Sequence, residues 1–78
     1  MAELPLFFTR HALNRMRWRK IARSEIERIG LAPASRIPDR EHPRIHLFGT
    51  LPDRRRVRVV VVEEKRRVVI VTVIDKER

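Results

Sequence analysis

Two valine-rich runs in the second half of the chain constrain the fold more than any other feature. In residues 55–63 the side chains alternate between two faces, one with Val57, Val59 and Val61 and the other with Arg56, Arg58, Val60 and Val62. A period of two residues is the pattern of a β-strand. Residues 68–74 are apolar on both faces, which is typical of a strand inside a sheet or covered by another chain. The charged residues 63–67 between them predict a hairpin loop, so the two runs predict an antiparallel pair.

The first half of the chain predicts two helices. Thr9 has the side chain of an N-cap, and residues 10–18 predict a helix whose Ala12, Leu13 and Met16 face the sheet. Residues 23–30 predict a second helix, which Gly30 and Pro33 end.

The remaining segments predict short strands and turns. Residues 4–8 are apolar and predict an edge strand, residues 34–44 a loop or irregular strand, and residues 45–48 a further strand before a turn at Pro52 and Asp53. We therefore expect one RelE-like α+β domain over residues 1–78, with two N-terminal helices packed on a three- to four-stranded antiparallel sheet.

The charge of the chain indicates its class of partner. Its 78 residues carry a net charge of +9, and sixteen of the nineteen Lys and Arg residues are Arg, which binds phosphate through a planar fork. A thermophile or a GC-rich genome would also raise the Arg content, so both interpretations stay open. The absence of Cys excludes disulfides and favours the cytoplasm, and no apolar run approaches the roughly 18 residues of a membrane span.

Two basic clusters are candidate sites. His11, Arg15 and Trp18 follow the spacing i, i+4, i+7 on the first helix with Arg19 beside them, so the arginines could hold phosphate while Trp18 stacks on a base. The alternative is a solvated basic face. The second cluster, at the start of the long strand, could bind phosphate or simply keep the sheet from aggregating; it comprises Arg54, Arg55, Arg56 and Arg58.

The histidines outside the first helix carry less information. His46 on a strand is more often a packing residue than a catalyst, and His42 lies in a loop between prolines. His11, His42 and His46 show no spacing typical of metal ligands, so we expect no metal and no cofactor.

Several runs resemble a small prokaryotic family of domains of unknown function. Residues 8–16, FTRHALNRM, are similar to its aromatic-T-x-H-A-x-x-R-M, and residues 21–26, IARSEI, to its I-S/T-x-x-E-I. Residues 54–60 and 69–73 are similar to G-R-x-L-x-V-V and V-I-V-T-V. The resemblance covers nearly the whole chain, and H-A-x-x-R-M is its most specific part.

That family looks like a distant relative of the RelE-like and BrnT-like toxins. The resemblance implies two helices on an antiparallel sheet, RNA cleavage, and an antitoxin partner. The positions that match the polar motif are His11, Arg15, Arg55 and Thr72. The chain departs from the family at Ala22, where Ser or Thr is expected, and at Arg54, where glycine is expected. It also lacks the Tyr that RelE-like enzymes often use.

These observations predict a toxin-type, metal-independent endoribonuclease. The 2′-hydroxyl would attack phosphorus with His11 as general base or acid, while Arg15 and Arg58 hold the scissile phosphate. The residues expected to bind RNA around them are Trp18, Arg19, Arg55, Arg56 and Thr72. The partners would be RNA, either free or on the ribosome, an acidic antitoxin, and a second copy of the chain. The alternative is a non-catalytic module that binds nucleic acid or protein.

Overall fold

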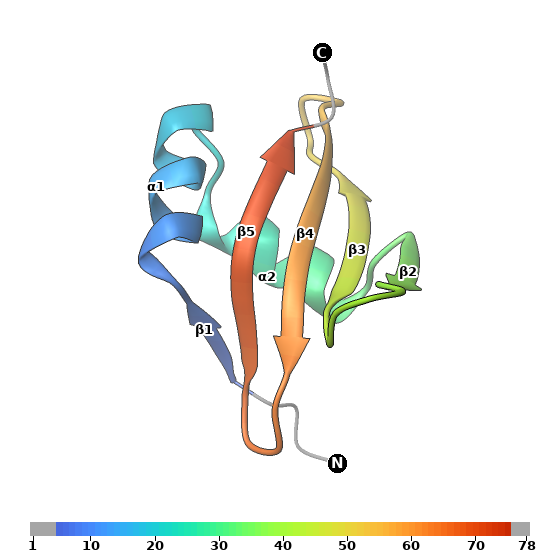
Figure 1. Cartoon of the computed structure of the whole chain (residues 1–78). Coiled ribbons are helices and arrows are strands. Elements are labelled where there is room, and N and C mark those ends of the chain that lie inside the picture. The colour runs from blue at the N-terminus through green and yellow to red at the C-terminus, as the bar shows by residue number, and fades with distance from the viewer. Residues whose placement is uncertain (1–4, 76–78) are drawn as a thin grey trace.

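The computed structural model describes residues 5–75, which form two helices and a five-stranded sheet (Figure 1). The strand order is β1-β5-β4-β3-β2. In chain order the elements are β1 (Leu6–Phe8), α1 (Arg10–Arg19), α2 (Arg23–Leu31), β2 (Ser35–Pro38), β3 (Ile45–Thr50), β4 (Arg56–Glu63) and β5 (Val68–Asp75).

The α+β class with two helices is confirmed, but the sheet has five strands and is mixed, which corrects the expected RelE-like fold with a three- to four-stranded antiparallel sheet. The strands β2 to β5 form an antiparallel meander, and the predicted pair β4 and β5 is confirmed. The strand β1 adds to the far edge parallel to β5, with Phe8 opposite Ile70. The pattern of a single strand does not say which partner it takes, or in which direction, when that partner is some sixty residues away. Of the expected strand at residues 4–8, Leu4 lies outside the described residues.

Both helices pack on the same face of the sheet. Val57, Val59 and Val61 of β4 are buried there, as the alternation predicted, together with Ile26 and Ile29 of α2. Ile70 and Val73 of β5 join the same core cluster. The doubly apolar β5 lies between β1 and β4, so its interior position is also confirmed.

Helix α1 contacts the sheet through a narrow strip. It packs beside β5, and only Ala12 and Met16 of its ten residues are buried (Figure 1). Leu13, which the sequence placed in the core, is 41% exposed. The prediction for Leu13 was wrong because the contact with the sheet involves only the pair Ala12 and Met16. The Leu13 side chain points about 100° around the helix from Ala12 and lies outside this contact.

The two helices begin differently. The Thr9 side chain accepts a hydrogen bond from the Ala12 amide at 3.1 Å, which confirms Thr9 as N-cap of α1. Its hydroxyl also lies 3.0 Å from the carbonyl oxygens of Ile70 and Val71, which fixes the start of α1 to β5. Ala22 caps α2 without a side-chain hydrogen bond, as expected from its departure from Ser or Thr.

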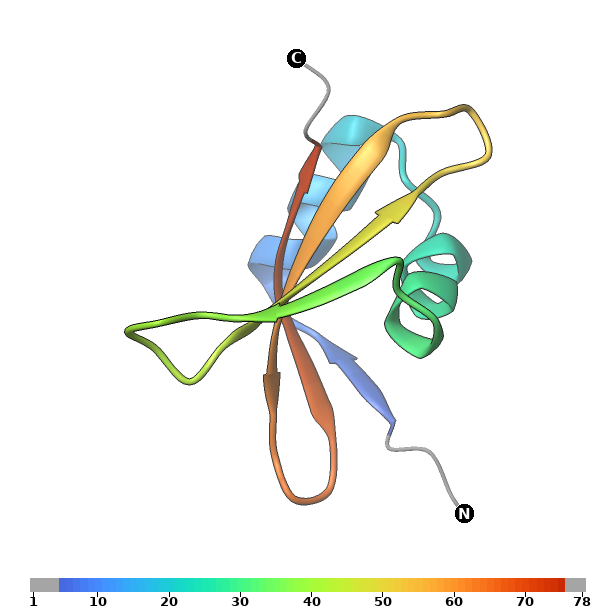
Figure 2. The same cartoon turned by 90° about the vertical axis from the view of Figure 1, so that its right-hand side faces the viewer.

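Within residues 5–75, neither helix packs on the second face of the sheet, which we call the uncovered face. The register places on it Phe7 of β1, Ile37 of β2, His46 and Phe48 of β3, Arg58, Val60 and Val62 of β4, and Val69, Thr72 and Ile74 of β5. Phe7 and Ile37 are 47% and 53% exposed. Figure 2 shows the strong twist of the sheet and the β2–β3 connection projecting away from the helices.

Candidate nucleic-acid interface

The predicted stripe of His11, Arg15 and Trp18 lies on the outer, exposed face of α1. Its spacing beside the buried residues predicted a groove edge where the helix meets the sheet, and that position was wrong, because no sheet residue lines the hollow there. His11, Asn14, Arg15 and Trp18 line an open hollow of about 220 Å³. Trp18 is 85% exposed, the largest exposed fraction among the exposed large apolar side chains of the described chain. We refer to His11, Arg15, Trp18 and Arg19 as the α1 stripe. Because Trp18 does not pack on the domain, its ring is free to stack against a planar group from outside.

A second hollow continues past the end of α1. It has a volume of about 460 Å³ and is lined by Trp18, Arg19, Lys20, Arg55 and Asp75. Trp18 therefore lies between two hollows, each with an arginine in its lining. This arrangement could receive a base at Trp18 with phosphates on either side, as aromatic and basic residues do in proteins that bind single strands.

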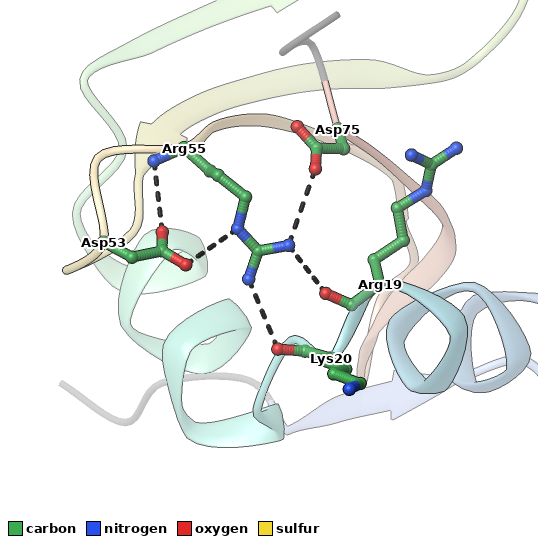
Figure 3. Close-up of polar contacts among 5 residues, drawn as sticks. All are labelled: Arg19, Lys20, Asp53, Arg55 and Asp75. Atoms are coloured by element: carbon green, nitrogen blue, oxygen red, sulfur yellow. Dashed lines mark hydrogen bonds and ion pairs between the residues drawn. The ribbon is translucent and has the colours of Figure 1, made fainter.

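Arg55 takes a structural position at the base of the second hollow (Figure 3). Its Nη1 donates to the Arg19 carbonyl at 2.6 Å and its Nη2 to the Lys20 carbonyl at 3.3 Å. Its Nε donates to Asp53 at 2.8 Å, and Nη1 lies 3.5 Å from a carboxylate oxygen of Asp75. The guanidinium thus holds the negative end of α1 against the last strand.

This bonding changes the interpretation of Arg55 as an RNA-binding residue. Each of its three guanidinium nitrogens already has a protein partner, and only one of its five N–H groups, at Nη2, remains for a phosphate. The hydrogen bonds that Asp53 accepts from the Arg55 backbone and side chain lower the pKa of that carboxyl. In Figure 3 the Arg19 side chain extends away from this cluster, and its guanidinium makes no contact with the other residues drawn.

The sheet residues of the predicted site lie apart from His11 and Arg15. Arg58 and Thr72 belong to the uncovered face, with β5 between β4 and α1. Arg56 is exposed at the start of β4, where it lines a hollow with Ile37 and Phe48. The hollow at His11 has no sheet residue in its lining. The structure therefore does not bring His11 and Arg15 together with Arg58 in one cleft.

The structure also pairs His46 with Asp39, which the sequence analysis missed. The His46 Nε2 lies 3.0 Å from Asp39 Oδ2, and each side chain is about one-fifth exposed. The hydrogen bond from His46, followed by those from the backbone amides of Glu41 and His42, holds the pKa of Asp39 well below its usual range. The seven-residue separation crosses an irregular loop, so no periodic pattern could have revealed this pair.

Comparison with family models gives one match, to a domain of unknown function, DUF4258, over residues 8–75. The chain belongs to the DUF4258 family. Searches of curated proteins and of solved structures gave no match. DUF4258 membership confirms that the chain belongs to a family of domains of unknown function, while the H-A-x-x-R-M motif and the relation to RelE-like and BrnT-like toxins stay predictions.

Two further findings describe this DUF4258 domain. Within residues 5–75, no group of three or more His, Cys, Asp or Glu side chains is placed to hold a metal ion. Neither of the described helices is long and apolar enough to cross a membrane.

Proposed function

We propose that this DUF4258 domain binds single-stranded RNA through the α1 stripe. The observation that carries the proposal is the 85% exposure of Trp18 next to Arg15 and Arg19 on a chain with a net charge of +9. Arg15 and Arg19 supply guanidinium groups for phosphate, and Trp18 supplies a stacking surface for an unpaired base. Bases inside a duplex are already stacked, so this combination favours single strands.

Fluorescence of Trp18 gives a direct test, because it is the only Trp and the chain has no Tyr. Titration with single-stranded RNA should quench the emission, whereas the same RNA annealed to its complement should quench it less at equal concentration. Unchanged Trp18 emission at saturating single-stranded RNA would contradict the proposal.

Truncation of the ring should weaken binding. Stacking of one base on an aromatic side chain contributes about 1–3 kcal/mol, so Trp18→Ala should raise the dissociation constant by roughly 5- to 150-fold. Anisotropy of a labelled RNA measures this constant. Leu31→Ala is the matched control, because Leu31 is 61% exposed at the end of the other helix and should leave the affinity unchanged.

We propose further that the domain is a RelE-like, toxin-type endoribonuclease that acts without a metal ion. The sequence runs that resemble the toxin-related family support this proposal, as does the net charge of +9. Growth arrest on induced expression, with cleaved cellular RNA, is the expected result. Binding to RNA without cleaved product or growth arrest would instead favour the non-catalytic nucleic-acid-binding function.

An acidic antitoxin is the partner we propose for the uncovered face. Phe7 and Ile37 are about half exposed there, and the Arg67 guanidinium lies 4.6 Å from the centre of the Phe7 ring, so apolar groups and a positive charge adjoin. Such a surface suits a partner with apolar and acidic side chains. A second copy of the chain would bring like charges together. Sedimentation of the purified chain distinguishes the two: a stable homodimer at physiological salt would contradict an antitoxin as the main occupant.

A further inference from the structure

Two buried side-chain atoms in residues 5–75 have no hydrogen-bond partner, His46 Nδ1 and Arg58 Nε. A buried polar group without a partner destabilises the folded state, and native proteins keep few of them. Such atoms therefore often mark a place where a ligand or an ordered water completes the bonding.

The two unpaired atoms belong to neighbouring residues on the uncovered face. His46 lies opposite Val60 in the β3–β4 register, and Arg58 is two residues before Val60, so His46 and Arg58 are diagonal neighbours. Thr72 of β5 lies opposite Val60 on the other side. A basic ring, a guanidinium and a hydroxyl thus surround one valine on a face that no helix covers.

Asp39 determines which nitrogen of the His46 ring carries the hydrogen. Its Oδ1 accepts hydrogen bonds from the amides of Glu41 and His42 at 2.8 and 3.1 Å, which orients the carboxylate. An ionised Asp39 can only accept at Oδ2, so the His46 Nε2 donates to it. In the neutral ring Nδ1 then carries the lone pair and can accept a proton.

We propose that His46 and Arg58, with Asp39 as a positioning residue, form the centre that cleaves RNA. This inference rests on the proposed function. His46 Nδ1 requires a donor and Arg58 Nε an acceptor, and a ribonucleotide offers both within one unit, the 2′-hydroxyl and the phosphate. The occupant is therefore a ribose-phosphate step of the RNA that the α1 stripe binds.

The reaction follows from these two contacts. His46 Nδ1 takes the 2′-hydroxyl proton, O2′ forms a bond to phosphorus, and the bond from phosphorus to the 5′-oxygen of the next nucleotide breaks. The leaving 5′-oxygen takes a proton from the imidazolium or from water, so one product carries a 2′,3′-cyclic phosphate and the other a 5′-hydroxyl. Arg58 stabilises the charge that develops on the phosphate oxygens.

Access to both atoms involves the edge of the sheet. Ile37 is the β2 neighbour of His46 and is 53% exposed, and all four residues of β2 are exposed. An edge strand of this kind is among the less stable parts of a fold, so the proposed route of the ribose to Nδ1 is a local opening of β2. A purely structural His46–Asp39 pair would explain the hydrogen bond at Nε2, with ordered water bonding to the two unpaired atoms, and it would predict no effect of His46 on the rate of cleavage.

His46→Gln is the decisive variant, because the glutamine amide can still donate to Asp39 but offers no base. It should lower the rate of RNA cleavage by about 10²- to 10⁴-fold and leave RNA affinity within about twofold. His42→Gln is the matched control, since His42 is an exposed histidine of the loop between β2 and β3. The variant keeps the backbone amide that bonds to Asp39 and should keep the full rate. A 2′-deoxy nucleotide at the cleavage position should block cleavage, and the product end should be a 2′,3′-cyclic phosphate.

The assay uses a labelled single-stranded RNA oligonucleotide of mixed sequence, free and as mRNA on ribosomes, with binding and cleavage measured on the same samples. Cleavage by His46→Gln at the wild-type rate would overturn the inference and leave RNA binding standing. Wild-type protein that binds but cleaves neither substrate would overturn it in the same way. If the wild-type protein does not bind RNA at all, the proposed function itself fails, and this centre fails with it. Circular dichroism melting of both variants verifies that they fold.

Discussion

At the scale of single residues, Arg55 illustrates how a basic side chain can belong to the fold rather than to a ligand. Arg55, directly before β4, bonds to the carbonyls at the end of α1 and contacts Asp75, whose side chain is 8% exposed (Figure 3). Arg56, the next residue, is exposed at the start of β4. Two adjacent arginines of the same cluster therefore have different roles, and the run of four arginines did not distinguish them.

Replacing Arg55 should destabilise the domain more than replacing its neighbour. Arg55→Met removes two hydrogen bonds to helix-end carbonyls and two carboxylate contacts, and we expect a loss of about 1–2 kcal/mol in the free energy of unfolding, since the side chain is partly solvated. Arg56→Met should change it by less than about 0.5 kcal/mol. Urea denaturation measures both, and equal effects would show that the Arg55 contacts contribute little.

Because of Asp39, the stability of the domain should depend on pH in the acid range. Its pKa in the folded chain is lowered, chiefly by the hydrogen bond with His46, from an ordinary value of about 3.9. The folded state therefore favours the ionised carboxylate, so the resulting stability is present above about pH 4 and is lost as the pH falls toward the lower folded pKa.

Asp39→Asn should remove this contribution. The free energy of unfolding of the variant should be lower than that of the wild type at neutral pH. The difference between the two proteins should narrow as the pH falls below about 4. Urea denaturation at several pH values measures the difference. A gap between the two proteins that is constant from neutral pH to pH 3 would contradict this assignment.

At the scale of elements, the packing of α2 on β3 depends on the missing side chain of Gly49. A Cβ atom there would lie 2.7 Å from Cγ1 of Ile29, whose side chain is buried in the core, so Ile29 would have to shift. In contrast, a Cβ atom on Gly30 of α2 would meet Leu6 at an ordinary 3.5 Å. Of the two glycines of the chain, Gly30 has room for a larger side chain and Gly49 does not.

Alanine at these two positions should have opposite effects. Gly49→Ala should destabilise the domain by about 1–3 kcal/mol through overpacking. Gly30→Ala should stabilise it by about 0.5–1 kcal/mol, because alanine loses less backbone entropy in a helix. Thermal unfolding followed by circular dichroism measures both shifts. A stable Gly49→Ala variant would show that α2 can move away from β3.

The elements themselves were largely predictable, and their partners were not. Period-two alternation identified the core face of β4, and the N-cap at Thr9 identified the start of α1. Two features were not predictable from local patterns: how many residues of α1 are buried, and the parallel pairing of β1 with β5. Both depend on contacts between elements that are distant in the sequence. The turn residue Arg54 has a φ of 76°, in the left-handed region that glycine adopts readily. This backbone angle explains why glycine is expected at that position.

At the scale of the whole molecule, the sequence predicted the face of a single helix better than the meeting of distant elements. The α1 stripe and the exposed Trp18 follow from helical spacing alone. The predicted meeting of His11 with Arg58 requires two elements that β5 separates, whereas His46 is placed beside Arg58 by strand register. Register, unlike spacing along one helix, is fixed by the tertiary fold, so sequence analysis gave His46 little weight.

Salt dependence tests whether the charge of the molecule acts through one face of α1. For a single strand, log affinity falls with log salt by about 0.7 per neutralised phosphate. Arg15→Gln with Arg19→Gln should therefore reduce the slope by about 1.4, the contribution of two phosphates at that rate.

The matched control removes the same charge from elsewhere on the same helix. Arg10→Gln with Arg17→Gln replaces two exposed arginines outside the stripe and should leave the slope nearly unchanged. If the two double variants lose the same slope, the +9 charge acts through the whole surface and α1 has no special part. A slope lost only with Arg15 and Arg19 would place the RNA backbone along α1, because variants of equal net charge differ only in where the positive charge lies.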